Sequence, residues 1–245
     1  MRLNSFQLKI FAMILMVLDH ISTYIPNMPF WFNMVGRIVA PIFFFLIVEG
    51  FFHTRDRKKY AFRLFSWALV MFLGTNVVIR IFIREYQIHN NIFLSLGMSV
   101  LLMSVIELSR KNKENKKLYI LGIVGLIVIG ILSIFTEAGI YGLVMTLIFY
   151  FLRDNKSKMT IIYVIVSLLL TVGMGFTAVI EIPDYSIRNL LLDDVQWMMV
   201  FAFPFFFMYN GKRGLNTKFT KYLFYIFYPL HIWIIYIVGF YIVGK

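Results

Sequence analysis

Apolar runs of about the length of a membrane-spanning helix follow one another along almost the whole chain. A bilayer core of about 30 Å requires roughly 20 mainly apolar residues per helix. The runs predict nine helices, at residues 6–25, 33–52, 61–83, 91–109, 117–135, 138–152, 159–181, 195–209 and 222–243. The sixth and eighth runs are short, so we expect them to be tilted, broken or partly re-entrant. The pattern therefore predicts an all-α, polytopic membrane bundle that forms a single domain over residues 1–245.

Basic residues are divided unequally between alternate connections of these helices. Of the 24 lysines and arginines, 19 lie in the N-terminal segment and in residues 53–63, 110–117, 153–158 and 210–221, and 4 lie in the other connections. The positive-inside rule then places the N-terminus in the cytoplasm and the C-terminus outside. Because this bias accounts for the net charge of +12, we expect no nucleic-acid partner. We expect a multi-pass protein of the plasma membrane.

Composition supports the membrane assignment and excludes several chemistries. The chain is 60% hydrophobic with a mean hydropathy of +0.80, against about 45–50% apolar residues in soluble domains. It contains no cysteine, which excludes disulfides and thiolate nucleophiles. Its four histidines are scattered without paired metal-ligand spacing, so we expect no metal. The first apolar run has no small-residue cleavage site, which predicts a retained helix.

An Asp–His pair interrupts the first apolar run at Asp19 and His20. Ionisable groups in hydrocarbon cost about 2.5–3.5 kcal/mol each on insertion scales, so they persist where they are paired or functional. Adjacent helical residues point in different directions, so if His20 faces a cavity, Asp19 turns toward a neighbouring helix. We expect Asp19 to meet Arg37, which lies at a similar depth from the outer side. This ion pair is either purely structural or leaves Arg37 able to reach an anionic ligand.

Other polar residues interrupt the apolar runs at several levels. Asn91 and Tyr141 begin the fourth and sixth predicted helices at the outer side, and His231 lies near the midplane of the ninth. We expect these groups to line one cavity together with the Asp–His pair. Glu49 and His53 lie at the inner end of the second helix, where they are not expected to join it.

Two charged connections have alternative interpretations. The outer connection contains Glu181, Asp184, Asp193 and Asp194 against Arg188, so it is either simply solvated or able to guide a cationic acceptor. The basic run at 55–59 most simply sets the topology, and it can also attract the phosphates of a cytosolic ligand or anionic lipid.

Five sequence blocks carry a resemblance to a known family. They are LMVLDH at 15–20, GRIVAPIF at 36–43, NIF at 91–93, YGL at 141–143 and FYPLH at 227–231. In this order they resemble the TraX family, which is named for the acetylase of F-type conjugative pilin. The resemblance covers about residues 6–240. The family is similar in outline to other transmembrane acyltransferases, including the lysosomal enzyme that acetylates terminal glucosamine of heparan sulfate.

The resemblance implies transfer of an acetyl group from acetyl-CoA, as donor substrate, to an amine or hydroxyl of an extracytoplasmic or membrane-associated acceptor. Such an acceptor is a peptide, a pilin-like protein or a glycan. The implied roles are catalysis for His20, Asp19 and His231, and binding of acetyl-CoA for Arg37, Asn91 and Tyr141. We expect His20 to act as general base. Direct transfer and an acetyl-histidine intermediate both stay open, as do N- and O-acetylation.

A small-molecule or lipid transporter or flippase is the competing class, because intramembrane charges and Pro-broken helices occur there too. The lack of a convincing internal repeat argues against it. A non-enzymatic scaffold has little reason to keep buried polar groups. The expected partners are membrane lipid, acetyl-CoA and an acceptor that the sequence does not identify. The oligomeric state is open, with a homodimer as one option.

Overall fold

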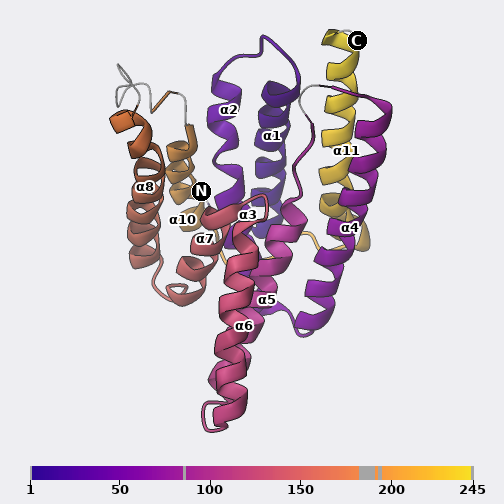
Figure 1. The fold of residues 1–245 in the computed structure, drawn as a ribbon. Coiled ribbons are helices and arrows are strands. Elements are labelled where there is room, and N and C mark those ends of the chain that lie inside the picture. Colours follow the sequence, from indigo (N-terminus) through magenta and orange to yellow (C-terminus); the bar gives the residue numbers. More distant parts are fainter. Residues whose placement is uncertain (1, 85–86, 182–190, 193–194, 244–245) are drawn as a thin grey trace.

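The computed structural model of the chain describes residues 2–84, 87–181, 191–192 and 195–243. Within these ranges the chain is helical, as predicted, and the extended pairing there is one isolated parallel bridge between Leu3 and Tyr209. Figure 1 shows the helices gathered side by side around α1 and α3. Residues 182–190 and 193–194 of the acidic connection lie outside the described residues.

The helices follow the predicted apolar runs closely. They are α1 (Ser5–Tyr24), α2 (Trp31–Gly36), α3 (Val39–His53), α4 (Arg57–Ile81), α5 (Ile92–Lys111), α6 (Lys116–Ile134), α7 (Gly139–Phe151), α8 (Lys156–Glu181), the 3-10 helix η1 (Val195–Ala202), α10 (Phe203–Met208) and α11 (Lys218–Val243). In the described part of the chain, seven helical segments are long and apolar enough to cross a membrane, counting α2 and α3 as one. The two short predicted runs form α7 and the η1–α10 segment, which do not reach that length.

The second predicted helix is broken between α2 and α3. Pro41 has no backbone N–H to donate to the carbonyl of Arg37, so the α-helical ladder cannot continue through this point. The backbone closes the end of α2 with shorter-range bonds instead, from Arg37 N to Met34 O (3.4 Å) and from Ile38 N to Val35 O (3.2 Å). The break fixes the position of Arg37 beside α1.

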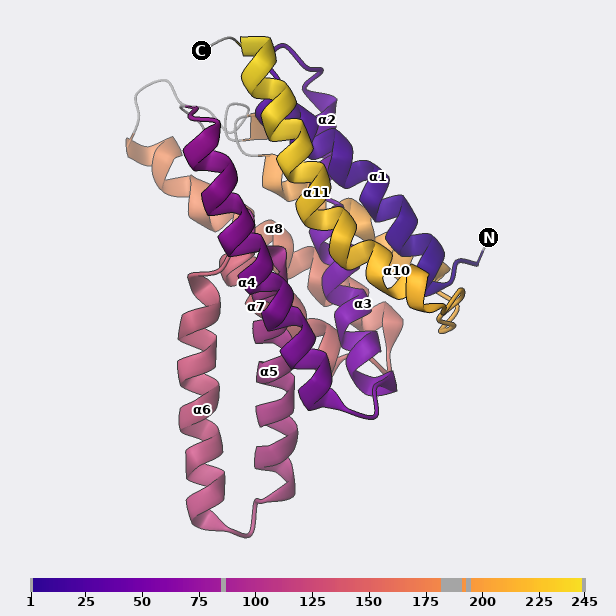
Figure 2. The same cartoon turned by 90° about the vertical axis from the view of Figure 1, so that its right-hand side faces the viewer.

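The two helices that carry the histidines of the first and ninth apolar runs lie side by side. Figure 2 shows α1 and α11 running in the same direction along one side of the bundle. The start of α1 is anchored by bonds from Leu3 N to Met208 O (2.7 Å) and from Asn210 N to Leu3 O (2.9 Å). A capping box between Asn4 and Gln7 closes its first turn. These contacts set the register of α1 against the rest of the bundle.

The core lies where α1, α3, α4, α5 and α7 pack together. Its largest fully buried side chains include Phe44 and Phe51 of α3 and Phe149 of α7. By contrast, α6 packs mainly on α5 and exposes a long apolar face. Only 17% of its membrane-length apolar stretch is buried inside the protein. Such a face is stable in hydrocarbon, in keeping with a membrane-embedded helix.

The packing of α4 on α11 provides a stability prediction. A Cβ atom at Gly74 of α4 would collide with the indole ring of Trp233, whose Nε1 donates to Thr75 Oγ1 at 3.1 Å. We expect Gly74→Ala to destabilise the fold by about 1–3 kcal/mol, as overpacking does, and to lower the melting temperature in detergent. Gly130→Ala in α6, where an added Cβ meets no atom within 4 Å, is the matched control. Equal melting temperatures for the two variants would contradict the packing argument.

Candidate active site

Two histidines meet inside the bundle, one from α1 and one from α11. His20 Nδ1 lies 3.0 Å from His231 Nε2, although 211 residues separate them in sequence. Both side chains are buried, with relative exposures of 4% and 7%. The structure therefore brings together two of the three residues expected to be catalytic.

Hydrogen bonding determines where the protons sit in the neutral histidine pair. His231 Nδ1 lies 2.8 Å from the carbonyl oxygen of Phe227. Because a carbonyl only accepts, this nitrogen carries the proton and Nε2 of His231 is an acceptor. His20 Nδ1–H then donates to His231 Nε2, which leaves Nε2 of His20 with an unprotonated lone pair. The pair thus offers one basic nitrogen, as general base catalysis requires.

Aromatic rings enclose the histidine pair. The ring of Phe227 stacks on His231 with centroids 4.8 Å apart and an interplanar angle of 11°. Tyr228 lies edge-on to His231 at 5.8 Å, and Tyr24 is parallel to His20 at 6.3 Å. These rings limit the access of bulk water and hold both imidazoles in place.

Asp19 turns away from the histidine pair toward Arg37. Asp19 Oδ1 lies 3.7 Å from Arg37 Nη2, so the expected ion pair is confirmed. Arg37 also donates to Asn33 Oδ1 from Nε (3.3 Å) and Nη2 (3.0 Å), and to Gln196 Oε1 from Nη1 (3.4 Å). A Cβ at Gly36 would collide with the Asp19 carboxylate, so the glycine allows α2 to approach α1 this closely. The guanidinium is therefore held by protein groups on several sides.

Breaking this ion pair should destabilise the fold. The side chains of Arg37 and Asp19 are 31% and 21% exposed, between the surface and the interior. We expect Arg37→Gln to lower the free energy of unfolding by about 2 kcal/mol, between the roughly 1 kcal/mol of surface pairs and the roughly 3–5 kcal/mol of buried ones. Asp19→Asn combined with Arg37→Gln should recover part of this loss. Strictly additive losses in a double-mutant cycle of melting curves would show that the charges do not interact.

Asn91 and Tyr141 start α5 and α7, at the helix ends where they were expected. Asn91 Nδ2 donates to the carbonyl of Ala68 at 3.0 Å. Its Oδ1 is buried and, within the described chain, accepts no hydrogen bond. Tyr141 is half-buried in the first turn of α7, against the core. Asn91 thus combines an anchored amide nitrogen with an acceptor oxygen still available to a ligand.

Glu137, in the connection between α6 and α7, was not among the residues expected from sequence. Its Oε2 accepts from Tyr228 Oη at 3.1 Å and its Oε1 from Asn90 Nδ2 at 3.3 Å. Asn90 Oδ1 in turn accepts from Tyr24 Oη at 2.7 Å. Tyr24 lies one helical turn after His20, a spacing that the sequence could have flagged. The hydrogen bonds of Tyr24 to Asn90 and of Tyr228 to Glu137 join residues far apart in the chain, so no local sequence pattern indicates them.

The surroundings of Glu137 change its acidity. Nearby protein atoms displace water and raise the pKa of Glu137 to about 7, although the side chain still contacts solvent. The neutral donors Asn90 and Tyr228 partly oppose this effect by stabilising the carboxylate, and Asp19 adds to it as a like charge. Glu137 can therefore both hold and release a proton near neutral pH.

A cavity of about 420 Å³ lies at the end of the bundle where α1, α4 and α11 begin and α3 ends. Four basic side chains line it there, namely Lys9, Arg63, Arg213 and Lys221. The acidic residue Glu49, which also lines it, is engaged by Arg153, with Oε1 2.7 Å from Nε. Glu49 and His53 lie at the expected end of the bundle, but both line this cavity, contrary to the expectation that they would not join it. The mouth of the cavity therefore carries uncompensated positive charge.

The other end of this cavity is apolar and approaches the histidine pair. It is lined there by Met16, Phe93, Leu96 and Tyr228. Met16 precedes His20 by one helical turn, and the ring of Tyr228 is 5.8 Å from that of His231. The expected common lining is not observed, because the cavity-lining residues do not include Asp19, His20, Arg37, Asn91, Tyr141 or His231. A ligand with an anionic head and a long apolar arm matches this distribution.

Comparisons with known proteins agree with the five sequence blocks. The family model described as TraX protein matches residues 5–239. The chain is 27% identical over 244 residues to the probable fimbrial assembly protein FimC, serogroup H1, of Dichelobacter nodosus. That alignment covers 94% of this chain and 93% of the relative. No solved structure matches the chain.

Proposed function

Since this chain belongs to the TraX family, we propose that it is a transmembrane acetyltransferase. It moves an acetyl group from acetyl-CoA to an amine or hydroxyl of an extracytoplasmic or membrane-associated acceptor. The observation that carries this proposal is the buried His20–His231 pair, with one unprotonated nitrogen, beside the apolar end of a basic-mouthed cavity. Base catalysis at such a nitrogen is what acyl transfer to an amine or hydroxyl needs.

The cavity supports acetyl-CoA as the donor. The basic connections support a cytoplasmic mouth under the positive-inside rule, on the side of the membrane where acetyl-CoA is found. Lys9, Arg63, Arg213 and Lys221 would hold the phosphates through charge-assisted hydrogen bonds. The apolar lining would take the pantetheine arm and guide the thioester toward the histidines, while the nucleotide stays at the mouth. A donor from one side of the membrane would thus serve an acceptor from the other.

The histidine pair performs the proton transfers in this proposal. Nε2 of His20 takes the proton of the acceptor as the new bond to the acetyl carbon forms. The Nδ1 proton of His20 can move to His231 Nε2, 3.0 Å away, so the positive charge is shared by both rings. The proton then returns to the sulfur of the departing CoA. The overall reaction gives one acetylated acceptor and one free CoA thiol. The number of protons bound to the protein is the same before and after the reaction.

The residues proposed to bind the acetyl donor already make contacts within the protein. Arg37 and Asn91 already donate to protein acceptors, so a contact with the thioester oxygen requires them to exchange partners. Tyr141 stays a proposed donor to the oxyanion of the tetrahedral intermediate, the species that such hydrogen bonds stabilise. Asp19, paired with Arg37, is proposed to act by holding the α1–α2 contact behind His20.

The similarity to a probable fimbrial assembly protein suggests where to look for the acceptor. A pilin-like protein is therefore the first acceptor that we propose to examine, with peptides and glycans as the others. The plasma membrane is the proposed location, because an acceptor of this kind passes through it.

The decisive experiment measures binding of acetyl-CoA to the purified full chain in lipid nanodiscs, followed by release of free CoA with candidate acceptors. We expect saturable binding, and weaker binding of acetyl-pantetheine, which lacks the nucleotide phosphates. Comparing acetylated surface molecules of cells with and without the protein would identify the acceptor. If acetyl-CoA neither binds nor is cleaved, the acetyltransferase proposal fails, and transport of a small molecule or lipid becomes the better explanation.

A further inference from the structure

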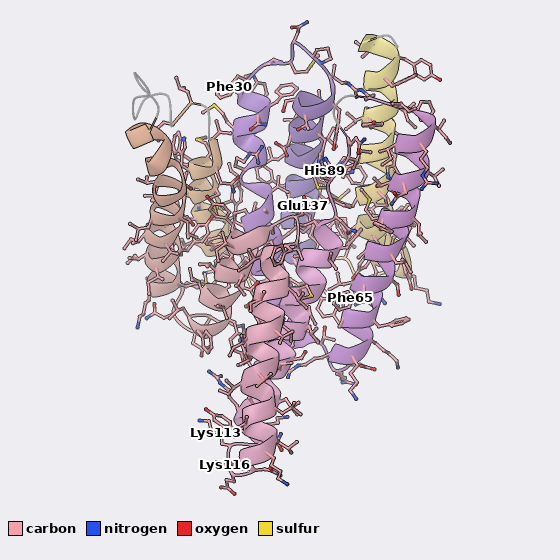
Figure 3. All side chains as sticks on the ribbon, in the orientation of Figure 1. Phe30, Phe65, His89, Lys113, Lys116 and Glu137 are labelled. Atoms are coloured by element: carbon pink, nitrogen blue, oxygen red, sulfur yellow. The ribbon has the colours of Figure 1, made fainter. Side chains whose placement is uncertain are left out.

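Glu137 accepts a hydrogen bond from Tyr228, a residue that also lines the apolar end of the basic cavity. It follows the end of α6, and Figure 3 shows it at the opposite end of the α5–α6 hairpin from Lys113 and Lys116. Its side chain is exposed to solvent. Under the proposed topology this is the outer side, from which an extracytoplasmic acceptor arrives.

The carboxylate of Glu137 is held in place without a cation. Tyr228 Oη, Asn90 Nδ2 and the backbone N–H of Asn91 donate to it, and all three are neutral. None of the ion pairs in the described part of the chain includes Glu137. Asp19, which has the same sign, acts on it electrostatically. The site therefore has a fixed orientation and an unbalanced negative charge.

Two further acceptor oxygens near this carboxylate are incompletely satisfied. Asn91 Oδ1 is buried and, in the described structure, accepts no hydrogen bond. Asp19 Oδ1 is also buried and makes no hydrogen bond, although Arg37 Nη2 lies 3.7 Å away as its ion-pair partner. Buried acceptors normally have a partner, so these atoms indicate a donor-rich ligand. An ammonium group carries positive charge and three N–H donors, which is the complement of such a set.

Each histidine packs against a tyrosine that is linked to Glu137, either directly or through Asn90. Tyr228 bonds to the carboxylate and lies edge-on to His231. Tyr24 bonds to Asn90, which itself bonds to the carboxylate, and lies parallel to His20. An acceptor held at Glu137 thus lies on the same network of side chains as the proposed general base His20.

We propose that Glu137 receives the acceptor, binding its amino group as an ammonium ion and removing one proton from it before acetyl transfer. This inference rests on the proposed acetyltransferase function and narrows its acceptor to an amine. The reason is chemical, because an ammonium nitrogen has no lone pair and cannot attack a thioester until it loses a proton.

The proton balance of this sequence closes. The ammonium gives one proton to the Glu137 carboxylate and becomes a neutral amine. Its lone pair forms the C–N bond while the C–S bond breaks, and the second proton passes through His20 to the sulfur. Glu137 then releases the first proton to the outer solution. One ammonium and one thioester give one amide, one thiol and one proton.

The acidity of the groups suits the first step. The pKa of Glu137 is raised to about 7 by displaced water, close to the value of about 8 for an α-amino group. The transfer from ammonium to carboxylate is therefore nearly balanced, so Glu137 can take the proton and later release it.

The test uses glycinamide and glycolamide, which differ only in an amine against a hydroxyl. Binding of each to the purified full chain in nanodiscs is measured by saturation-transfer NMR without acetyl-CoA. We expect the wild type to bind glycinamide in preference to glycolamide, and Glu137→Gln to weaken glycinamide binding at least tenfold. Glu107→Gln is the matched control, because Glu107 also accepts from a tyrosine, Tyr150, at 2.7 Å. It should leave glycinamide binding unchanged.

Turnover separates acceptor recognition from a general loss of structure. Glu137→Gln should raise KM for glycinamide at least tenfold, while acetyl-CoA binding and any transfer to glycolamide stay unchanged. Equal affinity of the wild type and Glu137→Gln for glycinamide would overturn this inference even if acetyl transfer occurs. Intact, Glu137-dependent binding of glycinamide without acetyl-CoA binding would instead overturn the acetyltransferase proposal, and the transfer step with it.

Discussion

Replacing His20 with alanine should abolish acetyl transfer while the protein still inserts and binds acetyl-CoA. The substitution removes the one imidazole nitrogen of the His20–His231 pair that is free to accept a proton. A positioned general base contributes about 10²–10⁴-fold to rate, so we expect a loss of about a thousandfold. The measurement is release of free CoA by the purified variant in the presence of an acceptor.

Controls for this substitution are available in the same chain. His89→Ala changes a solvent-exposed histidine and should leave turnover unchanged. His231→Gln keeps an acceptor for His20 Nδ1–H, so it should retain more activity than His231→Ala. Near-normal turnover in His20→Ala would remove His20 from the mechanism. Acetylation of the wild-type chain at His20 without acceptor, detected by mass spectrometry, would favour the acetyl-histidine intermediate.

Reversing charge at the cavity mouth should weaken acetyl-CoA binding by about a hundredfold. Arg63 and Arg213 line the mouth, and a hydrogen bond to a charged group is worth about 1.5–3 kcal/mol. We expect Arg63→Glu combined with Arg213→Glu to raise the Kd for acetyl-CoA by this factor. The loss should shrink as salt concentration rises, because exposed charges are screened. Titration of acetyl-CoA into nanodiscs at two salt concentrations provides the measurement.

The matched control carries the same change in charge at a distant place. Lys113→Glu combined with Lys116→Glu alters the far end of the α5–α6 hairpin, where Figure 3 shows both lysines. It should leave acetyl-CoA binding unchanged. Acetyl-pantetheine binding should be equal in all variants, which would show that the cavity is intact. If both double variants lost acetyl-CoA affinity equally, the loss would come from the net charge of the protein. The basic residues at the cavity mouth would then have no specific role in binding.

Contacts between neighbouring helices could be predicted from the sequence. The short connection 26–32 makes α1 and α2 neighbours, and depth counted from that connection places Asp19 level with Arg37. The ion pair follows from these two facts alone. The helix positions were predictable for the same reason, since each apolar run fixes its own span.

The apolar pattern alone does not predict contacts between distant helices. The cavity expected to join His231 to the Asp–His pair rested on their polar character and depth, and the 3.0 Å contact of His20 with His231 depends on the packing of α11 on α1. Glu137 gives no signal in the sequence, because the positive-inside rule depends on lysines and arginines and an isolated acidic residue in a short connection is ordinary. Its donors, Asn90 and Tyr228, come from two other segments and leave no local pattern.

The partner of His20 is synthesised near the end of the chain. Helix α1 enters the membrane early in translation, whereas His231 follows 211 residues later in α11. Until then the imidazole of His20 lies in an apolar helix without its histidine partner, at an energetic cost in hydrocarbon. A ribosome that stops before α11 therefore leaves an unfinished polar site exposed inside the bilayer. The complete pair of histidines therefore exists only after α11 has been inserted beside α1.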